Sequence, residues 1–423
     1  MNNRYYICLL SCLFWWVGYQ PAGAQPQPGD VFREYVWQPG TALPESTFLR
    51  VGGRLGYQQD TAAFPNDRYT DGFIPLPHAL DLTQALRAEI QVERVQSHEG
   101  TRRFTIEVNR RDPILIPDSD SISQPAYDYL RHDYPVVEVP LEQLRASADN
   151  AFRLQVDTVQ DWGWPQHLVY GVIFRIYYDE SKPHPTGSVL TPAAGSALDT
   201  TVVLTAAASG PVPIRQVDYL GNYRGLNWEG DGIYQQWHYR FHHGEIADHL
   251  GTALTPPYQT NWNTAWVPDQ PQPVQIAARI TDTTGLTYVT EPVGGITFSR
   301  PDFSVELCAP YDQPKQWATR SGEFTEHFQV NGDLSKATGY QLAWVSWSPC
   351  YANGVFINDH LIATGTGPCY EYQQHLLTQT DTRVLHSGKN RLTTGKTPLY
   401  RDEMVHGMEV QWPGIMVKVR YEK

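Results

Sequence analysis

"LDLTQALRAEIQVERVQSHEGTRRFTIEVNRRDPIL", residues 80–115, has a counterpart near the other end of the chain in "GDLSKATGYQLAWVSWSPCYANGVFINDHLIA", residues 332–363. Each stretch begins with Asp-Leu-Thr or Asp-Leu-Ser, passes through an alternating segment and a turn, and ends a second segment in Val-Asn or Ile-Asn. Apolar residues recur at every second position, as in Phe104, Ile106 and Val108, which is typical of half-buried β-strands. The stretch therefore predicts an all-β fold.

The similarity between the two ends continues through three further segments in the same order. They are PAYDYLRH (125–132) with PCYEYQQH (368–375), NAFRL (150–154) with NRL (390–392), and WPQHLVYGVIFRIYYD (164–179) with WPGIMVKVRYE (412–422). Four ordered matches predict two copies of one domain, at residues 25–183 and 301–423. We expect the tyrosines and acids of the first pair to share a structural role at the sheet edge, and a paired binding surface is the alternative.

Both copies resemble galactose-binding-like jelly rolls. The resemblance rests on the polar Asp-Leu-Ser/Thr entry, on the strand that ends in Asn109 or Asn358, and on a late strand that follows Asn150 or Asn390. It covers about two thirds of the chain. It implies β-sandwiches of a kind common among carbohydrate-binding modules and accessory domains of secreted glycosidases, although a fold does not fix a ligand.

The middle of the chain, residues 184–300, resembles a bacterial immunoglobulin-like domain. The segments that carry the resemblance are VDYL (217–220), LGTALTPPYQTNW (250–262) and ARITDTTG (278–285). In the usual pattern the first of these leads within a few residues into the second, whereas here residues 223–249 intervene. Long loops that a fold does not need often carry function, and a flap that packs on a neighbouring domain is the structural alternative. We therefore expect three β-sandwich domains: a jelly roll, an immunoglobulin-like domain with an inserted loop, and a second jelly roll.

The N-terminus predicts export. Residues 1–24 contain an arginine, an apolar run over residues 7–17 and an Ala-Gly-Ala sequence, which indicate a signal peptide cleaved near Ala24 and a secreted or periplasmic protein. The run is too short for a membrane helix, so no membrane insertion is expected. A net charge of −13 argues against nucleic acid as a partner. Outside the signal, Cys350 and Cys369 could form a disulfide with Cys308 left over, and the sequence leaves this pairing and the oligomeric state open.

The insertion contains "WHYRFHHGEIADHLG", residues 237–251, which holds four histidines. In a helix, His238, His242, Glu245 and His249 would share one face, and imidazoles with a carboxylate could bind zinc or another divalent metal ion. Gly244 interrupts the segment, its aromatic residues suit a strand equally well, and the spacing is not that of a metalloprotease motif.

A second interpretation assigns the insertion to glycan binding. Aromatic rings pack on the C–H faces of sugars while acids and amides bind the hydroxyls. The expected ligand is a neutral glycan or polysaccharide, and the alternative is that the tryptophans are core or interdomain anchors. The candidate ligand-binding residues, the last two from a charged loop near the C-terminus, are Trp228, Asp231, Tyr234, Trp237, His238, His242, His406 and Glu409.

Three classes of function therefore remain open. A glycan-binding protein without catalytic activity is the leading interpretation. A glycoside hydrolase or polysaccharide lyase would need paired carboxyl groups, for which Glu229, Asp231 and Glu245 are the candidates. A structural or adhesive scaffold would use the insertion only to hold domains together. A buried insertion would favour the scaffold, an exposed aromatic strip the binding protein, and converging carboxylates in a cleft the enzyme.

Overall fold

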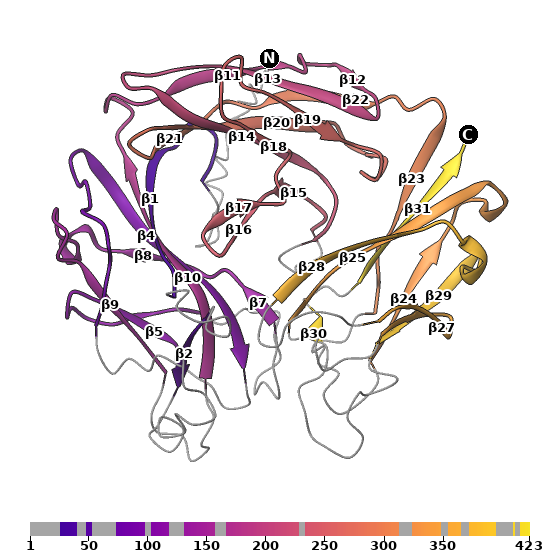
Figure 1. Cartoon of the computed structure of the whole chain (residues 1–423), viewed down its shortest axis with the longest axis horizontal. Helices are drawn as coiled ribbons and strands as arrows, with labels where there is room; N and C mark the ends of the chain where they lie inside the picture. The colour runs from indigo at the N-terminus through magenta and orange to yellow at the C-terminus, as the bar shows by residue number, and fades with distance from the viewer. Residues whose placement is uncertain are drawn as a thin grey trace, which may run out of the picture.

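The computed structural model describes residues 26–39, 48–52, 73–97, 103–117, 131–156, 166–227, 233–312, 324–347, 354–364, 372–394, 409–410 and 415–423. Over these residues the chain is all-β, as predicted, with strands arranged in antiparallel sheets and one parallel contact between β12 and β22. Figure 1 shows the sheets grouped around a central space. None of the helices in the described ranges is long and apolar enough to cross a membrane.

The largest sheet runs through the first and middle parts of the chain and has thirteen strands. They are β1 (Val31–Trp37), β2 (Leu49–Gly52), β4 (Ala85–Ser97), β7 (Arg131–Asp133), β8 (Val136–Val139), β10 (Gln166–Tyr178), β12 (Ala197–Leu198), β14 (Ile214–Arg224), β15 (Gln235–His238), β18 (Gly251–Ala253), β20 (Val274–Asp282), β21 (Leu286–Val289) and β22 (Val293–Phe298).

Smaller sheets cover or accompany this one. The small sheet of the first part holds β3 (Ile74–Pro75), β5 (Thr105–Val108), β6 (Ile114–Leu115) and β9 (Ala151–Gln155). The small sheet of the middle part holds β11 (Thr186–Thr191), β13 (Thr201–Ser209) and β19 (Gln259–Asn263). A separate hairpin consists of β16 (Arg240–His242) and β17 (Glu245–Ala247).

The last part of the chain contains two sheets of its own. One holds β23 (Phe303–Cys308), β25 (Ala337–Trp347), β28 (Tyr372–Gln379), β30 (Glu409–Val410) and β31 (Met416–Glu422), and the other holds β24 (Phe324–Val330), β26 (Val355–Ile357), β27 (His360–Ala363) and β29 (Gly388–Thr394). Three short 3₁₀-helices are η2 (Leu141–Gln143), η3 (Leu334–Lys336) and η5 (Thr382–Val384).

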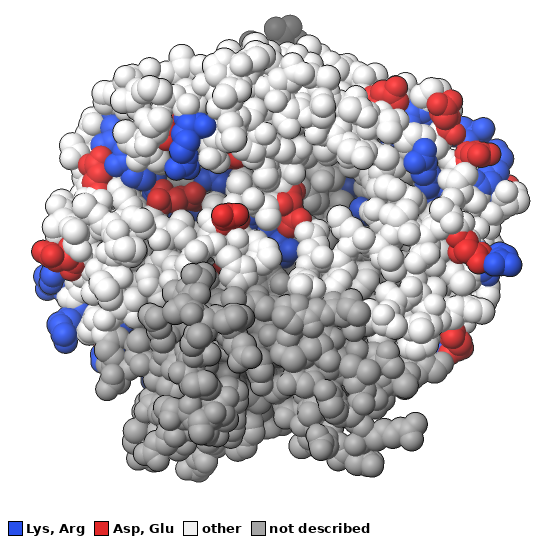
Figure 2. All heavy atoms as spheres, in the orientation of Figure 1, with Lys and Arg blue, Asp and Glu red and all other residues white. Residues whose placement is uncertain are grey.

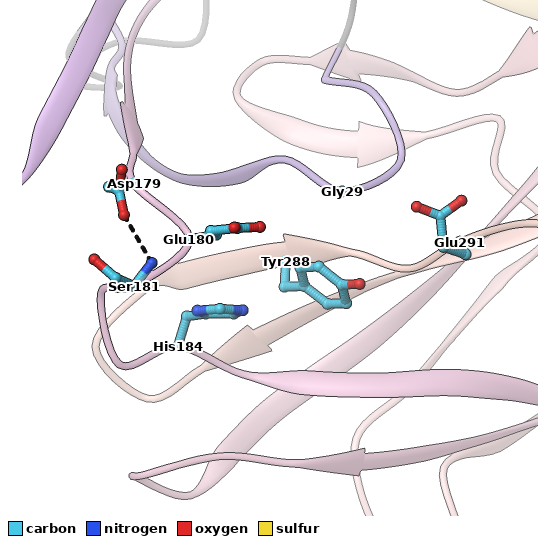
Figure 3. A pocket seen from close by; sticks show the side chains of 7 residues that line it. All are labelled: Gly29, Asp179, Glu180, Ser181, His184, Tyr288 and Glu291. Carbon is cyan, nitrogen blue, oxygen red and sulfur yellow. Dashed lines mark hydrogen bonds between the residues drawn. The ribbon is translucent and has the colours of Figure 1, made fainter.

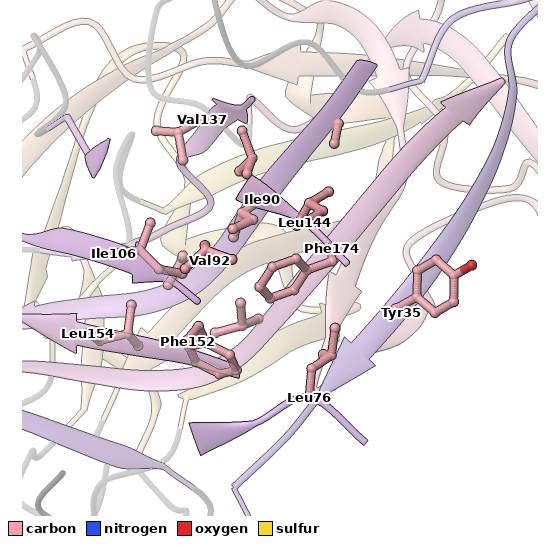
Figure 4. Close-up of a cluster of buried hydrophobic side chains, with 14 of the residues drawn as sticks. Tyr35, Leu76, Ile90, Val92, Ile106, Val137, Leu144, Phe152, Leu154 and Phe174 are labelled. Carbon is pink, nitrogen blue, oxygen red and sulfur yellow. The ribbon is translucent and has the colours of Figure 1, made fainter. Parts of the chain in front are cut away.

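Each part of the chain has its own apolar core between facing sheets. In the first part, Ile90 and Phe174 of the large sheet meet Ile106 and Phe152 of the facing sheet (Figure 4). The middle core lies around Tyr219, and the core of the last part contains strands of both of its sheets. Because alternate strand residues point to opposite faces, one side of each strand fills a core and the other remains available for contacts between the parts.

Strand β1 joins the first part to the middle part within one sheet. Its residue Val31 lies opposite Tyr178 of β10 on one side and opposite Tyr288 of β21 on the other. A domain boundary is expected between residues 183 and 184, and hydrogen-bonded strands from both sides of it belong to this one sheet. The two sandwiches therefore share backbone hydrogen bonds as well as side-chain contacts.

A corner built on two asparagines occurs once near each end of the chain. The amide Nδ2 of Asn109 donates to Oδ1 of Asn150 at 2.8 Å, and that of Asn358 donates to Oδ1 of Asn390 at 2.7 Å. Each donor residue has a left-handed backbone, with φ of 51° at Asn109 and 48° at Asn358, and each also donates to the last carbonyl of the 3₁₀-helix that comes later in the chain, η2 or η5. Asparagine tolerates this conformation better than most side chains. The two ends therefore share a detailed hydrogen-bonding pattern.

The repeated tyrosine motif is less equivalent than its letters indicate. His132 of β7 lies opposite Val95, whereas His375 of β28 lies opposite Trp344, which the aligned sequences place three residues earlier in the strand. Most of the motif's other residues lie outside the described ranges, as do Cys350, Cys369 and the signal sequence. Cys308 is described, and it is a buried free thiol.

Candidate functional site

The insertion forms strands where a helix was considered. Strand β15 extends β14, with Trp237 opposite Asn222, and β16 and β17 form a hairpin in which His242 lies opposite Glu245. The two residues between them, His243 and Gly244, both have positive φ, at 48° and 76°, which is the conformation of the tight turn that two-residue hairpins favour. The helical arrangement of the histidines is therefore wrong.

The four candidate metal ligands do not come together. Across the residues that the structure describes, His, Cys, Asp and Glu side chains form no group of three or more that could hold a metal ion. His249 Nε2 instead lies 2.6 Å from Oγ1 of Thr252, which donates to Asp218. Glu245 is exposed, and the ring of His242 lies 4.6 Å from that of His243. His238 ends β15, whereas His242 and Glu245 belong to the β16–β17 hairpin. The expected single face of four ligands is therefore not formed, and the metal hypothesis loses its geometric basis.

His238 has a packing role. It is 2% exposed, its ring stacks on Tyr223 at 3.9 Å, and its Nε2 lies 2.8 Å from the carbonyl oxygen of that residue. Burial lowers its pKa from 6.5 to about 4, although the hydrogen bond to Tyr223 opposes the shift. A Cβ at Gly225 would lie 2.6 Å from the same ring, so only glycine fits there. A neutral, enclosed imidazole of this kind holds the insertion in place.

The aromatic residues of the insertion also pack inward. Tyr239 and Phe241, which are 2% and 6% exposed, join Ile173 of the first part and Leu220 of the middle part in one cluster, and Trp237 packs against it. Tyr234 packs on a cluster of Leu226, Leu307 and Met416, which connects the insertion to the last part of the chain. The described rings that were candidates for sugar binding are therefore contacts between parts of the protein.

The tip of the hairpin docks on β1. A Cβ at Gly244 would lie 2.5 Å from Cγ1 of Val36 and 2.6 Å from Nε2 of Gln38. The backbone N–H of His243 donates to the carboxylate of Glu93 at 3.0 Å, and its ring meets Tyr170 edge-on at 5.4 Å. Val36, Glu93 and Tyr170 all belong to the first part, so the insertion of the middle part reaches across to it.

A network of buried charges lies beneath the hairpin. The carboxylate of Glu34 on β1 pairs with Arg175 of β10 at 2.8 Å and with Arg279 of β20 at 2.6 Å. Arg175 also pairs with Glu89 and donates to Gln91. Burial alone would raise the pKa of Glu34, but Arg279 and Arg175 outweigh it and lower that pKa below its usual value. These arginines are 1% and 4% exposed, so the network belongs to the interface between two parts.

Sequence reasoning missed these charged residues. In β1, β4 and β10 they alternate with apolar residues, which is also the pattern of a strand with one solvated face. The usable signal was the presence of two arginines and several carboxylates within strand-like segments, since buried charges are found almost only in pairs.

Several candidate residues lie outside the described ranges. These are Trp228, Glu229, Asp231 and His406, and Glu409 is described only as a backbone member of β30. The catalytic pair proposed from Glu229, Asp231 and Glu245 therefore has one described member, Glu245, and it is exposed on the hairpin. A general acid in a glycosidase is normally held in a shielded environment.

The first and middle parts also enclose an open depression of about 470 Å³ (Figure 3). The ring of Tyr288 lies 5.4 Å from that of His184, with Glu291 on one side and Asp179 and Glu180 on the other. The side chain of Ser181 lowers the pKa of the Asp179 carboxyl, and so does the backbone N–H of Ser181, which donates to Asp179 at 2.9 Å. Rings beside acids are the chemistry expected of the insertion, but here they follow the end of β10 or belong to β21 and the residues after it.

Comparisons with known proteins do not identify a family. No protein-family model and no curated protein matches the chain. Among solved structures, fibronectin(III)-like modules of CbhA from Clostridium thermocellum are 10% identical, with a TM-score of 0.19 over 53% of this chain and 92% of theirs.

Two glucuronidases are also similar in structure. The FMN-binding beta-glucuronidase of Facaelibacterium prausnitzii L2-6 is 11% identical, with a TM-score of 0.21 over 63% of this chain. Beta-glucuronidase 2 of Bacteroides uniformis is 8% identical, with a TM-score of 0.16 over 56% of this chain. The chain spans only 35% and 30% of these two enzymes, and scores this low specify neither an activity nor a ligand for it.

Proposed function

We propose that this chain is a non-catalytic scaffold, in which the insertion holds three β-sandwiches in one fixed arrangement. The observation that carries the proposal is the position of the hairpin. Its tip docks on β1, its aromatic residues fill the contact with β10, and the Glu34 network ties the same strands together. Contacts between domains of one chain are usually small and polar and permit motion, whereas this one combines apolar burial, paired charges and shared sheet hydrogen bonds.

The last part of the chain completes the arrangement. Val345 of β25 packs with Phe48, Val95, Leu168 and Tyr170 of the first part, while Tyr234 and Leu226 bridge the middle part to Leu307 and Met416. Every part therefore touches both of the others, as the grouping in Figure 1 also shows. Closed contacts of this kind favour a rigid body over a flexible string of domains.

The scaffold proposal is tested by loosening the hairpin while leaving the core inside each sandwich intact. Phe241→Ala removes an aromatic ring from the contact between the first and middle parts. We expect the radius of gyration in X-ray scattering to rise and amide exchange in β16 and β17 to accelerate, while the circular dichroism spectrum of the sheets is kept. Leu361→Ala, at an exposed position of β27, is the control. Unchanged scattering and exchange in Phe241→Ala would refute the scaffold role of the insertion.

We also propose the domain division expected from the sequence. The asparagine corners support the proposal that residues 25–183 and 301–423 are two jelly-roll copies, and the strands of residues 184–300 accommodate an immunoglobulin-like domain with its insertion. Export through an N-terminal signal remains a proposal from the sequence. N-terminal sequencing of the mature protein, expected to begin near residue 25, tests it.

Glycan binding is the second candidate function, and the depression in Figure 3 favours it. Tyr288 is half-buried there between carboxylates, and a ring flanked by acids can hold a neutral sugar. Native electrophoresis through gels that contain neutral polysaccharides tests this function. We expect retardation of the wild type and of Tyr311→Ala, whose ring is exposed in the last part, but not of Tyr288→Ala. If none of the polysaccharides changes the mobility of the wild type, the result would count against glycan binding.

The enzyme alternative is separated from the binding function by product analysis. A polysaccharide that retards the protein is incubated with it, and new reducing ends or unsaturated products would indicate a hydrolase or a lyase. A triple variant at Glu229, Asp231 and Glu245 then shows whether those carboxylates are responsible.

A further inference from the structure

The small sheet of the middle part, β11–β13–β19, contains no charged residue. Its strands, Thr186–Thr191, Thr201–Ser209 and Gln259–Asn263, lack Asp, Glu, Lys, Arg and His altogether. Charged residues make up 18% of the chain, and the solvated face of an antiparallel sheet is where polar and charged side chains normally lie. The composition of this sheet is therefore not that of an ordinary solvated face.

Alternation along the strands decides which side chains form the outer face of this sheet. Val202 and Leu204 of β13 belong to the middle core, so the residues between and beside them point outward. Val203 is one of these, and it lies beside Asn261 of β19. The other outward residues of the two strands are Thr201, Thr205, Ala207, Gln259 and Asn263. The face is thus built from hydroxyl, amide and small apolar groups.

This face lies on the outside of the molecule. Figure 1 places β11 and β13 at the top, on the far side of the middle part from the central space, and Figure 2 shows the surface there in white, without the coloured side chains seen on both flanks. Apolar side chains are exposed on or beside the face: Leu190 of β11 at 54%, Val203 at 40%, and Leu254, in the loop that leads into β19, at 66%. An outer surface with exposed apolar groups and no charge has the composition of an interface core, where charged residues are depleted.

We propose that this face binds the same face of a second copy of the chain, about a two-fold axis. An interface across a two-fold axis must be complementary to itself. The hydroxyl groups of Thr201 and Thr205 and the amide groups of Asn261 and Gln259 each contain a donor and an acceptor, so each can pair with its own kind. Val203 packs on apolar groups of the other copy.

The net charge of the chain favours this partner over others. At a net charge of −13, two copies repel each other, and contact is least costly where neither surface carries a charge. A strongly charged partner would find no opposite charge on these strands. A glycan would find no exposed aromatic ring on them either, because their one aromatic residue, Trp262, points into the middle core.

The size of the face sets the strength of the association. Three strands about 4.8 Å apart and the length of β13 give a surface of about 14 Å by about 30 Å, or about 400 Å². A stable interface buries about 800 Å² on each partner. We therefore expect a weak and reversible dimer, which is half formed at about 100 µM protein.

Sedimentation velocity tests the proposal on the wild type, Val203→Lys and Leu361→Lys, from about 5 to about 500 µM protein, where Leu361 is exposed on β27 of the last part. Both variants make the net charge less negative by the same amount, so only the position of the lysine differs. A lysine on the face must lose its water on contact. We therefore expect Val203→Lys to need at least about tenfold more protein to dimerise, and Leu361→Lys to match the wild type. A wild type that stays monomeric, or a dimer that Val203→Lys leaves intact, would overturn the proposal.

Salt dependence and amide exchange give two further measurements. Sodium chloride should strengthen the dimer, because it screens the repulsion between the copies while the contact itself contains no ion pair. Amide exchange in residues 201–209 and 259–263 should slow as the protein concentration rises. A dimer weakened by salt, or protection confined to other strands, would place the contact elsewhere and refute this face.

The same variants separate this proposal from the other functions. The face lies within one sandwich, so Phe241→Ala, which loosens the hairpin, should leave the dimer unchanged even if the scaffold role fails. If instead the wild type is monomeric, and Val203→Lys rather than Tyr288→Ala loses its retardation by a neutral polysaccharide, the face binds glycan and the second copy is excluded.

Discussion

Glu34 and Arg279 are joined across the boundary between the first and middle sandwiches, with 2.6 Å between Oε2 and Nη2. The second carboxylate oxygen of Glu34 binds Arg175 of its own sandwich, so one side chain serves two arginines. Both arginines are almost fully buried. An ion pair of this kind does more to fix a geometry than to add stability, because desolvation offsets much of the attraction.

Removing the charge of Glu34 should be costly even though the pair adds little net stability. In Glu34→Gln, two buried guanidinium groups lose their shared carboxylate. We expect the free energy of unfolding in urea to fall by about 3–5 kcal/mol, since an unpaired buried charge remains. The control is Asp359→Asn, which removes an exposed ion pair with Arg391 and should cost at most about 1 kcal/mol. Similar losses in both variants would show that the Glu34 network is solvated.

The hairpin tip should tolerate no side chain. In Gly244→Ala, the new Cβ meets Val36 and Gln38 and the residue keeps a positive φ. Gly285→Ala is the matched control, because it also has a positive φ but its Cβ would meet nothing closer than 3.9 Å. We expect about 1–2 kcal/mol of destabilisation from the backbone in both variants and about 1–3 kcal/mol more from the clash in Gly244→Ala. Equal melting temperatures for Gly244→Ala and Gly285→Ala would mean that the tip does not dock on β1.

The stability of the closed arrangement should fall in acid because of His238. Its pKa is lowered in the folded protein to about 4, from 6.5. The folded state therefore resists protonation, and the contribution of this group is full above pH 6.5 and is lost as the pH falls towards 4, by up to about 3 kcal/mol. Urea unfolding at pH 7 and pH 4.5 measures the loss. His238→Gln should reduce this difference, and a variant with the full pH dependence would assign it to other groups such as His167, whose pKa burial lowers well below its ordinary value.

The asparagine corner contributes to stability in two ways, through its hydrogen bonds and through a residue that tolerates the left-handed backbone. Asn358→Gly keeps the left-handed backbone but loses the hydrogen bonds, whereas Asn358→Ala loses both. We expect the alanine variant to be less stable than the glycine variant by about 1–2 kcal/mol, with the same order at Asn109. The melting temperatures of the four variants check this. A reversed order at one position only would argue that the two corners are not equivalent.

Much of the strand pattern could be predicted from local sequence. In both copies the Asp-Leu-Ser/Thr entry makes the same turn, in which the Asp81 carboxylate accepts the N–H of Thr83 and the Asp333 carboxylate accepts that of Ser335. Such turns depend on residues two apart and so are readable from short segments. The asparagine corners could be located by alignment for the same reason.

The insertion could not be predicted in this way. Its hairpin is fixed by contacts of Gly244 with Val36 and of His243 with Glu93, which lie far away in the sequence. Helix and strand patterns were both compatible with the segment, and the tertiary partner decided between them.

The position of β1 between a strand of the first part and a strand of the middle part also sets an order of events during synthesis. Residues 31–37 can pair with β10 once residue 178 has emerged, but their other edge stays open until residues 286–289 are available. An unpaired strand edge is a template for pairing with other chains. The unpaired edge of β1 therefore stays exposed while more than a hundred further residues are synthesised. Slow translation, or truncation within the middle sandwich, should favour aggregation.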